Sequence, residues 1–340
     1  MVSLKDLAKT LNLSPPTVSR ALRDCPQVNI KTRERVKRLA REAGYVPNHV
    51  ASGLKTSHSR TIGVLIPCIN MTYWATILEG IEEEANQHGY SAIIGITADA
   101  EQERTIKANV TSMLQKRVDG IIRISHFMDY PEELLAQMRG RGIALVDVEF
   151  DGLRPPNERV RIECDNHAGA YEATRYLIDL GHRRIGHIDG PVEISMIARQ
   201  RRAGILDALE ECGPSVVEMV GVQSGFDFDS GLEAAEHLMR QLAPPLAIVA
   251  CSDEVACAVF RVAHLKGLRV PSDLSIVGFG NREISRILPV PLTTVEIPAM
   301  EIGRLSFRHF LEQMDKTHSP PRRVTLGTRL LVRDSSGPVG

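Results

Sequence analysis

The chain of 340 residues has an ordinary composition for a folded protein, with 43% hydrophobic and 24% charged residues. It contains no signal peptide and no apolar run of about 18 residues, so we expect a protein that is neither exported nor embedded in a membrane. The 6 cysteines show no Cys-x-x-Cys spacing, which indicates reduced thiols packed in a cytoplasmic protein.

The net charge of −1 conceals two oppositely charged parts of the chain. Residues 1–60 carry 12 Lys and Arg against 4 Asp and Glu, a net charge of +8, whereas the remainder carries 29 against 38, a net charge of −9. A basic end on a nearly neutral protein is typical of a segment that binds nucleic-acid phosphates. We therefore expect this end of the chain to bind nucleic acid.

Three short helices are predicted in the basic segment, over residues 4–11, 15–23 and 31–43. Ser3 precedes the first helix, and Asp6 stands where a capping box places an acidic side chain. Ser14 is the expected cap of the second helix, because Pro15 and Pro16 fit only the first turn of a helix. A helix, a tight turn and a second helix with a polar leading face are typical of a helix-turn-helix. The alternative is a small solvated helical bundle.

A further short helix is predicted over residues 49–55, where Pro47 ends the preceding segment and Asn48 can cap a new helix. It is too short to be stable alone, because isolated helices need roughly 12–15 residues. We expect it to form only against its twin and DNA, with Leu54 wedged between base steps in the minor groove. The alternative is an ordinary linker whose leucine packs against the rest of the protein.

The remainder of the chain alternates apolar runs with amphipathic helical stretches. Nine strands are predicted, at residues 61–67, 91–97, 120–124, 144–148, 160–164, 184–189, 216–222, 246–250 and 274–279. The helices between them are predicted at residues 77–88, 101–117, 168–180, 197–212, 230–241 and 254–266. This alternation predicts an α/β body of two lobes, each built on a doubly wound parallel sheet. Ligands of such sheets bind at the carboxyl ends of the strands, which here means the cleft between the lobes.

No catalytic motif stands out in the sequence. Residues 278–283 begin like a dinucleotide-binding loop but lack its third glycine, and we interpret them as a turn. Asp253 and Glu254 are adjacent acids at a strand-to-helix junction, where the helix dipole accounts for them. We therefore expect no enzyme activity, no cofactor and no metal site. An enzyme built on the doubly wound body, or a solute-binding module with an incidental helical segment, remain the alternatives.

Four ordered segments resemble the LacI/GalR family of bacterial transcriptional repressors: VSLKDLAK at 2–9, LSPPTVSRAL at 13–22, TRERV at 32–36 and GYVPN at 44–48. The resemblance continues through nearly the whole chain. It implies a helix-turn-helix domain at 1–46, a hinge helix and linker at 47–60, and a periplasmic-binding-protein-like effector and dimerisation domain at 61–340. Lobe one would comprise about 61–164 and 296–326, and lobe two about 165–292 and 327–335. The chain would cross between lobes near Asp165, residues 292–297 and Gly327.

The resemblance also implies the residues that contact DNA. They are Ser14, Pro15, Pro16, Thr17 and Arg20 in the recognition helix and Asn48, Val50, Leu54 and Lys55 in the hinge. The two prolines depart from relatives that make polar base contacts at those positions. Direct reading of the bases would then rest on Arg20, whose planar fork suits guanine O6 and N7.

For the effector, the resemblance implies a cleft lined by Tyr73, Trp74, Asp165, Arg201, Phe226, Ser252, Asp253 and Asn281. An aromatic platform in a cleft suits a flat or partly apolar ligand. Trp74, the only tryptophan, could instead pack within lobe one.

One departure concerns the cleft itself, because many relatives have an aspartate where this chain has Gly280. Its loss removes a charged acceptor for ligand hydroxyl or amino groups. Either Asn281 or a residue of lobe one substitutes, or the ligand differs from the usual sugars, or effector binding has been lost. The effector is accordingly a sugar or another metabolite.

Together these features predict a dimeric, sequence-specific repressor that binds a pseudo-palindromic operator and is controlled by a small effector in the cleft. Effector binding would change the angle between the lobes and so the distance between paired hinge helices, with a coupling free energy of ~1–3 kcal/mol. The same machinery serves an inducer or a corepressor. Residues 333–340 contain no leucine heptad, which favours a dimer over a tetramer.

Overall fold

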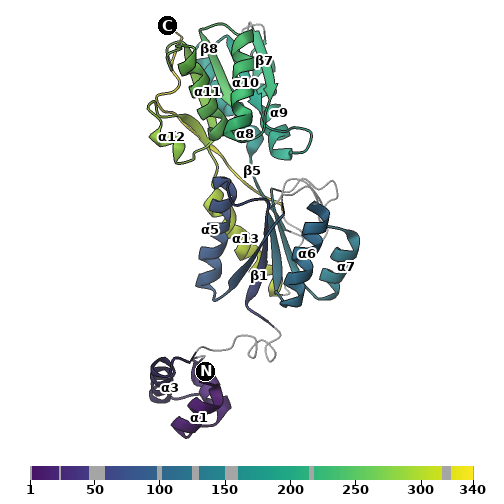
Figure 1. Cartoon of the computed structure of the whole chain (residues 1–340), viewed down its shortest axis with the longest axis vertical. Helices are drawn as coiled ribbons and strands as arrows, with labels where there is room; N and C mark the ends of the chain where they lie inside the picture. The colour runs from purple at the N-terminus through teal and green to yellow at the C-terminus, as the bar shows by residue number, and fades with distance from the viewer. Residues whose placement is uncertain are drawn as a thin grey trace. The chain divides into compact units, whose positions relative to one another are not determined.

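The computed structural model of the chain describes residues 2–22, 24–45, 58–97, 102–124, 130–149, 160–213, 218–315 and 323–339. It divides into two compact units, which we call the head (Met1–Ser59) and the body (Arg60–Gly340) (Figure 1). The hinge helix expected at residues 49–55 lies outside the described residues, together with Asn48.

The head contains α1 (Leu4–Leu11), α2 (Pro15–Leu22) and α3 (Ile30–Glu42). The expected capping box is present, because Ser3 Oγ accepts a hydrogen bond from Asp6 N while Asp6 Oδ2 accepts one from Ser3 N at 2.8 Å. The three helices enclose a small core of Leu7, Ala8, Leu11, Val18, Ala21, Val28, Val36 and Ala40. This core fixes the angle between α1 and α2, so the opposite face of α2 is presented to solvent.

Lobe one of the body is built on a parallel sheet whose strand order is β11-β5-β4-β3-β1-β2. Its strands are β1 (Thr61–Ile66), β2 (Ser91–Ile96), β3 (Gly120–Ile124), β4 (Ala144–Val148), β5 (Val160–Cys164) and β11 (Arg323–Leu326). The helices of this lobe are α5 (Thr72–Gln87), α6 (Gln102–Gln115), α7 (Glu132–Gly140) and α13 (Ala299–Met314). The strands β3 and β4 are buried along their whole length, as expected for strands covered on both faces.

Lobe two repeats this architecture with the strand order β12-β10-β9-β8-β6-β7, in which only β12 runs antiparallel to its neighbour among the described pairs. Its strands are β6 (Arg184–Asp189), β7 (Glu218–Gln223), β8 (Leu246–Ala250), β9 (Leu274–Gly280), β10 (Thr293–Glu296) and β12 (Arg329–Leu331). Its helices are α8 (Asn166–Asp179), α9 (Met196–Glu211), α10 (Phe228–Gln241), α11 (Asp253–Leu265) and α12 (Ile284–Ile287).

One close helix pair shows how lobe one is held together: α5 and α13 lie side by side against the sheet (Figure 1). Gly80 and Gly303 allow this approach, because a Cβ atom at Gly80 would lie 2.2 Å from the carbonyl oxygen of Met300. An ion pair fastens the same helices, with Arg308 Nε 3.0 Å from Glu84 Oε1. The C-terminal helix α13 is therefore an integral part of lobe one.

The chain passes between the two sheets at three places (Figure 1). The first is Asp165, between β5 and α8; the second is residues 297–298, between β10 and α13; the third is residues 327–328, between β11 and β12. The strands β10, β11 and β12 were not predicted as strands from the sequence. They have only 4, 4 and 3 residues, and their stability comes from pairing with distant strands rather than from an apolar run of their own.

No helix among the described residues combines the length and the apolar character needed to cross a membrane. Within the same residues, no three His, Cys, Asp or Glu side chains gather into a group that could hold a metal ion.

Candidate functional site

The exposed face of α2 carries the residues expected to read DNA. Ser14, Pro15, Pro16 and Arg20 are exposed, and Thr17 is half-buried, while Val18 and Ala21 on the other side enter the core. Ser14 Oγ caps the helix by accepting a hydrogen bond from Thr17 N at 3.3 Å. The guanidinium of Arg20 forms no hydrogen bond or ion pair with a described residue, so this side chain can extend into the solvent.

A small cavity of about 40 Å³ lies in the cleft between the lobes, and we call it the cleft cavity. Lobe one and the connection to α13 supply Met71, Tyr73, Trp74 and Ile297, and lobe two supplies Ile197, Arg201, Phe226, Ser252, Glu254, Phe279 and Arg282. The structure therefore brings together five of the eight residues expected there, namely Tyr73, Trp74, Arg201, Phe226 and Ser252.

The first turn of α5 places two aromatic rings in the cavity wall. The ring centroids of Tyr73 and Trp74 are 4.6 Å apart, with an angle of 51° between the ring planes. Trp74 is only 1% exposed and also belongs to the main apolar core of the body. It therefore lines the cavity and packs within the core at the same time. Tyr73 Oη donates a hydrogen bond to Glu149 Oε1 at 3.1 Å.

Arg201 projects from α9 into the cavity wall and is 6% exposed. Its Nε donates to Asn166 Oδ1 at 2.9 Å, and its Nη1 donates to the carbonyl oxygen of Cys251 at 2.5 Å. Its Cζ atom lies 3.8 Å from the ring centroid of Phe279, a cation–π contact. Burial lowers the pKa of Arg201, because the charged form loses its hydration.

Glu149 is a candidate that sequence reasoning missed. It follows β4 directly, is 1% exposed and has a left-handed backbone with φ of 50°. Its Oε1 also accepts a hydrogen bond from Cys164 N at 2.9 Å, whereas its buried Oε2 accepts none from the described residues. Burial raises the pKa of this carboxyl. Its position in the sequence could have identified Glu149 as a candidate, because an acid directly after a buried strand lies at the carboxyl edge of the sheet.

Arg282 also lines the cleft cavity and was not expected there. Its Cζ atom lies 4.9 Å from the ring centroid of Tyr73, so it reaches from lobe two to lobe one. Gly280 makes room for it: its φ is +132°, and a Cβ atom there would lie 3.1 Å from Arg282 Nε. The cationic side chain of Arg282 thus lies next to position 280, where many relatives were expected to carry an aspartate.

Three expected residues do not line the cleft cavity. Asp165 caps α8, with its Oδ1 accepting from Ala168 N at 2.9 Å. Asn281 donates from Nδ2 to Glu296 Oε1 at 2.9 Å and accepts from Arg333 Nη2 at 2.6 Å. Both side chains therefore stabilise the chain connections around the cleft.

Asp253 is the third of these residues and is completely buried. Its Oδ1 accepts from Thr294 Oγ1 at 2.5 Å, and its Oδ2 accepts from Arg282 N at 2.6 Å. Burial raises the pKa of Asp253 to about 6. Asp253 thus holds the backbone of the segment that carries Arg282. Its neighbour Ser252, which does line the cavity, caps α11 by accepting from Val255 N at 3.0 Å.

Comparison with known proteins gives the family of the chain. The family described as "Bacterial regulatory proteins, lacI family" matches residues 3–48, and "Periplasmic binding protein-like domain" matches residues 174–336. The transcriptional repressor CytR of Escherichia coli (strain K12) is 33% identical over 334 residues, which cover 98% of this chain and 96% of CytR. The chain belongs to the lacI family of bacterial regulatory proteins.

Other lacI-family proteins resemble the chain over similar lengths. The transcriptional repressor PurR of Escherichia coli O139:H28 is 33% identical over 336 residues, covering 98% of this chain and 97% of PurR. The lac repressor dimer bound to operator and the anti-inducer ONPF superposes with a TM-score of 0.84 at 25% identity, covering 99% of both chains. The family and the two-part fold class predicted from the sequence are confirmed. The protein is a DNA-binding transcriptional regulator and not an enzyme.

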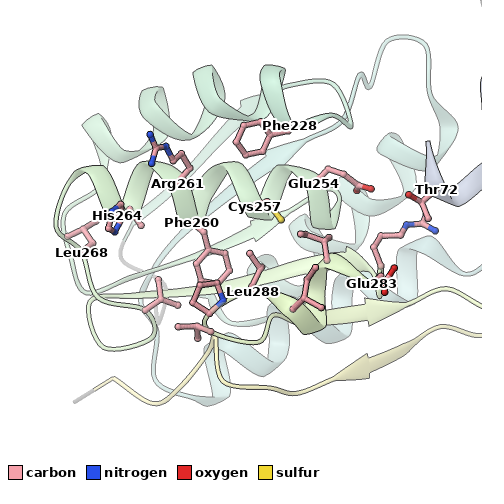
Figure 2. A pocket seen from close by; sticks show the side chains of 17 residues that line it. Thr72, Phe228, Glu254, Cys257, Phe260, Arg261, His264, Leu268, Glu283 and Leu288 are labelled. Atoms are coloured by element: carbon pink, nitrogen blue, oxygen red, sulfur yellow. The ribbon is translucent and has the colours of Figure 1, made fainter. Parts of the chain in front are cut away.

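This lacI-family chain also has a larger apolar groove beside the cleft, with a volume of about 1070 Å³ (Figure 2). It lies between α11 and the segment 282–290, and its apolar wall includes Cys257, Phe260, Leu268, Ile287, Leu288 and Val290. Figure 2 shows Phe260 and Leu288 facing the same hollow. Glu254 and Arg282 line both this apolar groove and the cleft cavity. The two therefore share one wall.

Proposed function

We propose that the protein is a cytoplasmic repressor that binds a pseudo-palindromic operator as a homodimer, under the control of a small molecule bound in the cleft cavity. The observation that carries this proposal is the combination, in one lacI-family chain, of an exposed polar face on α2 and a cavity walled by both lobes. The first provides a surface for DNA, and the second provides a place where a ligand alters the angle between lobes.

The head binds DNA through α2 in the major groove. Arg20 reads a guanine, because Pro15 and Pro16 offer no polar side chain and Pro15 has no backbone N–H. Val50, Leu54 and Lys55 act as a hinge helix in the minor groove, a role that rests on the sequence because these residues lie outside the described ranges.

A homodimer accounts for apolar surface on both lobes. On lobe one, Ile94 and Ile96 of the edge strand β2 are 49% and 46% exposed. On lobe two, the apolar groove includes Ile287, which is 68% exposed. Apolar side chains on an edge strand and in an open groove favour association unless they are covered. A second copy of the chain covers both, and the lac repressor neighbour was itself solved as a dimer on operator DNA.

The effector occupies the cleft cavity, against Tyr73 and Trp74 from lobe one and Arg201 and Phe226 from lobe two. Glu149, which does not line the cavity, holds the hydroxyl group of Tyr73 at the same edge of lobe one. A ligand that contacts both lobes selects one lobe angle, and this choice changes the affinity for the operator through linkage.

Operator titration tests the DNA-binding part of this proposal. Full-length protein is titrated against fragments of the DNA upstream of its own gene and against random fragments of equal length, at ~150 mM salt. We expect at least one upstream fragment to bind about 1000-fold more tightly than random DNA. Equal affinity for all fragments would contradict the proposal.

A further inference from the structure

Two arginines share the wall of the cleft cavity, and neither guanidinium forms a hydrogen bond or a close ion pair with a carboxylate of the described residues. Arg201 donates only to an amide oxygen and a carbonyl oxygen, and it stacks on Phe279. Arg282 stacks on Tyr73. Both cations are thus held in place by neutral groups.

For Arg201 this arrangement leaves a buried charge without a carboxylate in hydrogen-bonding contact among the described residues, and Glu149 acts on it only electrostatically. A buried cation is ordinarily paired with an anion, because its hydration is lost and neutral dipoles replace it only in part. The planar guanidinium also has five N–H donors, and its hydrogen bonds to Asn166 and to the carbonyl oxygen of Cys251 use two of them. Arg201 is therefore prepared for an additional acceptor on its cavity side.

For Arg282 the decisive feature is the backbone conformation of Gly280, two residues earlier in the chain. Gly280 adopts a φ of +132°, which a residue with a side chain rarely adopts, and a Cβ atom there would press on Arg282 Nε. A side chain at position 280 would therefore strain the backbone and require a small displacement of Arg282. At position 280 itself the lobe-two wall carries no carboxylate, and Arg282 presents a donor beside it.

None of the acids around the cleft forms a hydrogen bond or a close ion pair with either guanidinium among the described residues. Glu149 already accepts two hydrogen bonds on Oε1, and its burial favours the neutral form. Both carboxylate oxygens of Asp253 accept hydrogen bonds, one from Thr294 Oγ1 and one from the backbone N–H of Arg282. Glu254 lies on the wall shared with the apolar groove, where its charge acts on Arg282 electrostatically without a close ion pair among the described residues. The cavity consequently favours a negatively charged ligand.

We propose that the effector is a small anionic metabolite, whose carboxylate or phosphate group is bound between Arg201 and Arg282 while its neutral part lies against Tyr73 and Trp74. This inference rests on the proposed effector function of the same cavity. Guanidinium forks bind carboxylate and phosphate oxygens in pairs, which gives direction as well as strength. A cavity of about 40 Å³ holds little more than a water molecule, so the ligand enters by separating the lobes or by displacing Arg282 from Tyr73.

Trp74 provides the readout, because it is the only tryptophan and lies in the cavity wall. Its fluorescence is followed in the full-length protein at constant ionic strength during titration with inorganic phosphate and two matched pairs: ribose 5-phosphate against ribose, and glucuronate against glucose. We expect at least one anionic probe to bind about tenfold or more tightly than its neutral counterpart. The phosphorylated and carboxylated pairs distinguish the two kinds of anionic group.

Two variants assign the binding to the arginines. Arg282→Gln and Arg201→Gln each remove one charge and should weaken the anionic probe on the order of 10- to 100-fold. Arg286→Gln is the matched control, because Arg286 is exposed on α12 and lines neither the cleft cavity nor the apolar groove. Thermal unfolding is measured for each variant to establish that it is folded. If Arg201→Gln does not fold, Arg282→Gln alone tests the inference.

Three results would overturn the inference: neutral probes that bind as tightly as anions, wild-type protein that binds none of the anionic probes, or anion binding that Arg282→Gln and Arg286→Gln weaken equally. Operator titration of the same preparation separates the two proposals. Specific operator binding without any anion response contradicts only the anionic effector. Absence of specific operator binding contradicts the repressor function itself.

Discussion

Arg282 of lobe two lies over the ring of Tyr73 of lobe one, with 4.9 Å between its Cζ atom and the ring centroid. Tyr73 is fixed from the other side by its hydrogen bond to Glu149, and Arg282 is fixed through its backbone by Asp253. The contact therefore joins two rigid supports, one in each lobe. It bridges the two lobes at the wall of the cleft cavity.

A double-mutant cycle measures this contact. Arg282→Gln and Tyr73→Leu are combined, and the free energy of unfolding is determined for the four proteins. We expect a coupling of about 0.5–2 kcal/mol, the range of cation–π contacts from exposed to desolvated sites. Tyr73→Phe keeps the ring and should keep the coupling. A coupling of zero in the Tyr73→Leu cycle would show that the two side chains are merely adjacent.

Asp253 should make the folded protein less stable as pH rises, which is opposite to the usual effect of a carboxyl group. Its pKa in the folded protein is raised from 3.8 to about 6, so the folded state binds the proton more tightly than the unfolded chain does. Stability then falls as pH rises through this window, by about 3 kcal/mol for a shift of about 2 units in pKa. Asp253→Asn should remove this fall, as measured by denaturant unfolding across the window.

The control for this pH effect is Asp273→Asn. Asp273 is held by Arg269, which lowers its pKa to about 2, so its contribution to stability is lost only as pH falls below the ordinary value of 3.8. This variant should leave the profile above pH 3.8 unchanged. A wild-type profile identical to that of Asp253→Asn would mean that Asp253 is not the group responsible.

The apolar groove should be part of the dimer interface. Ile287→Glu places a charge among its apolar side chains and should shift the protein from dimer to monomer in sedimentation velocity. Leu265→Glu is the matched control, because Leu265 is 64% exposed but does not line the groove. If both variants sediment as the wild type does, the interface lies elsewhere.

Arg20 should determine base preference. Arg20→Ala should weaken specific operator binding by roughly 1–3 kcal/mol and relax the preferred base at one position in each half-site. Arg20→Lys keeps the charge but loses the paired donors, so it should recover affinity for random DNA without recovering the preference. The measurement is selection of binding sites from a randomised pool, and an unchanged preference in Arg20→Ala would exclude a base-reading role.

The sequence predicted those strands that carry a recognisable apolar pattern of their own. The strands β1 to β9 each contain several apolar side chains, although β5, β6 and β7 also carry charged ones, and the predicted ranges agree with them within a few residues. The strands β10 to β12 were not predicted because they are short and form by pairing with distant strands, as β11 does with β5. Helix α5 was predicted to begin at residue 77, but it begins at Thr72. The extra turn carries Tyr73 and Trp74, which continue the buried stripe formed by Ile77 and Ile81.

The candidate site was predictable to a similar degree. Arg201 and Phe226 were expected from family resemblance, and both line the cleft cavity. Glu149 was missed because its role depends on the hydroxyl of Tyr73, which is distant in sequence. Arg282 was missed because its direction depends on the backbone of Gly280, and a glycine gives no indication of which neighbour uses the space it leaves.

The most direct test of the account is the effect of an anion on operator binding. Full-length protein is titrated with its upstream operator fragment by fluorescence anisotropy, with and without a saturating amount of the anionic probe that Trp74 reports as the tightest. The account predicts an operator affinity that changes by about 5- to 150-fold, in either direction, and by much less in Arg282→Gln. An operator affinity that stays the same while Trp74 reports full occupancy would contradict control of DNA binding from the cleft.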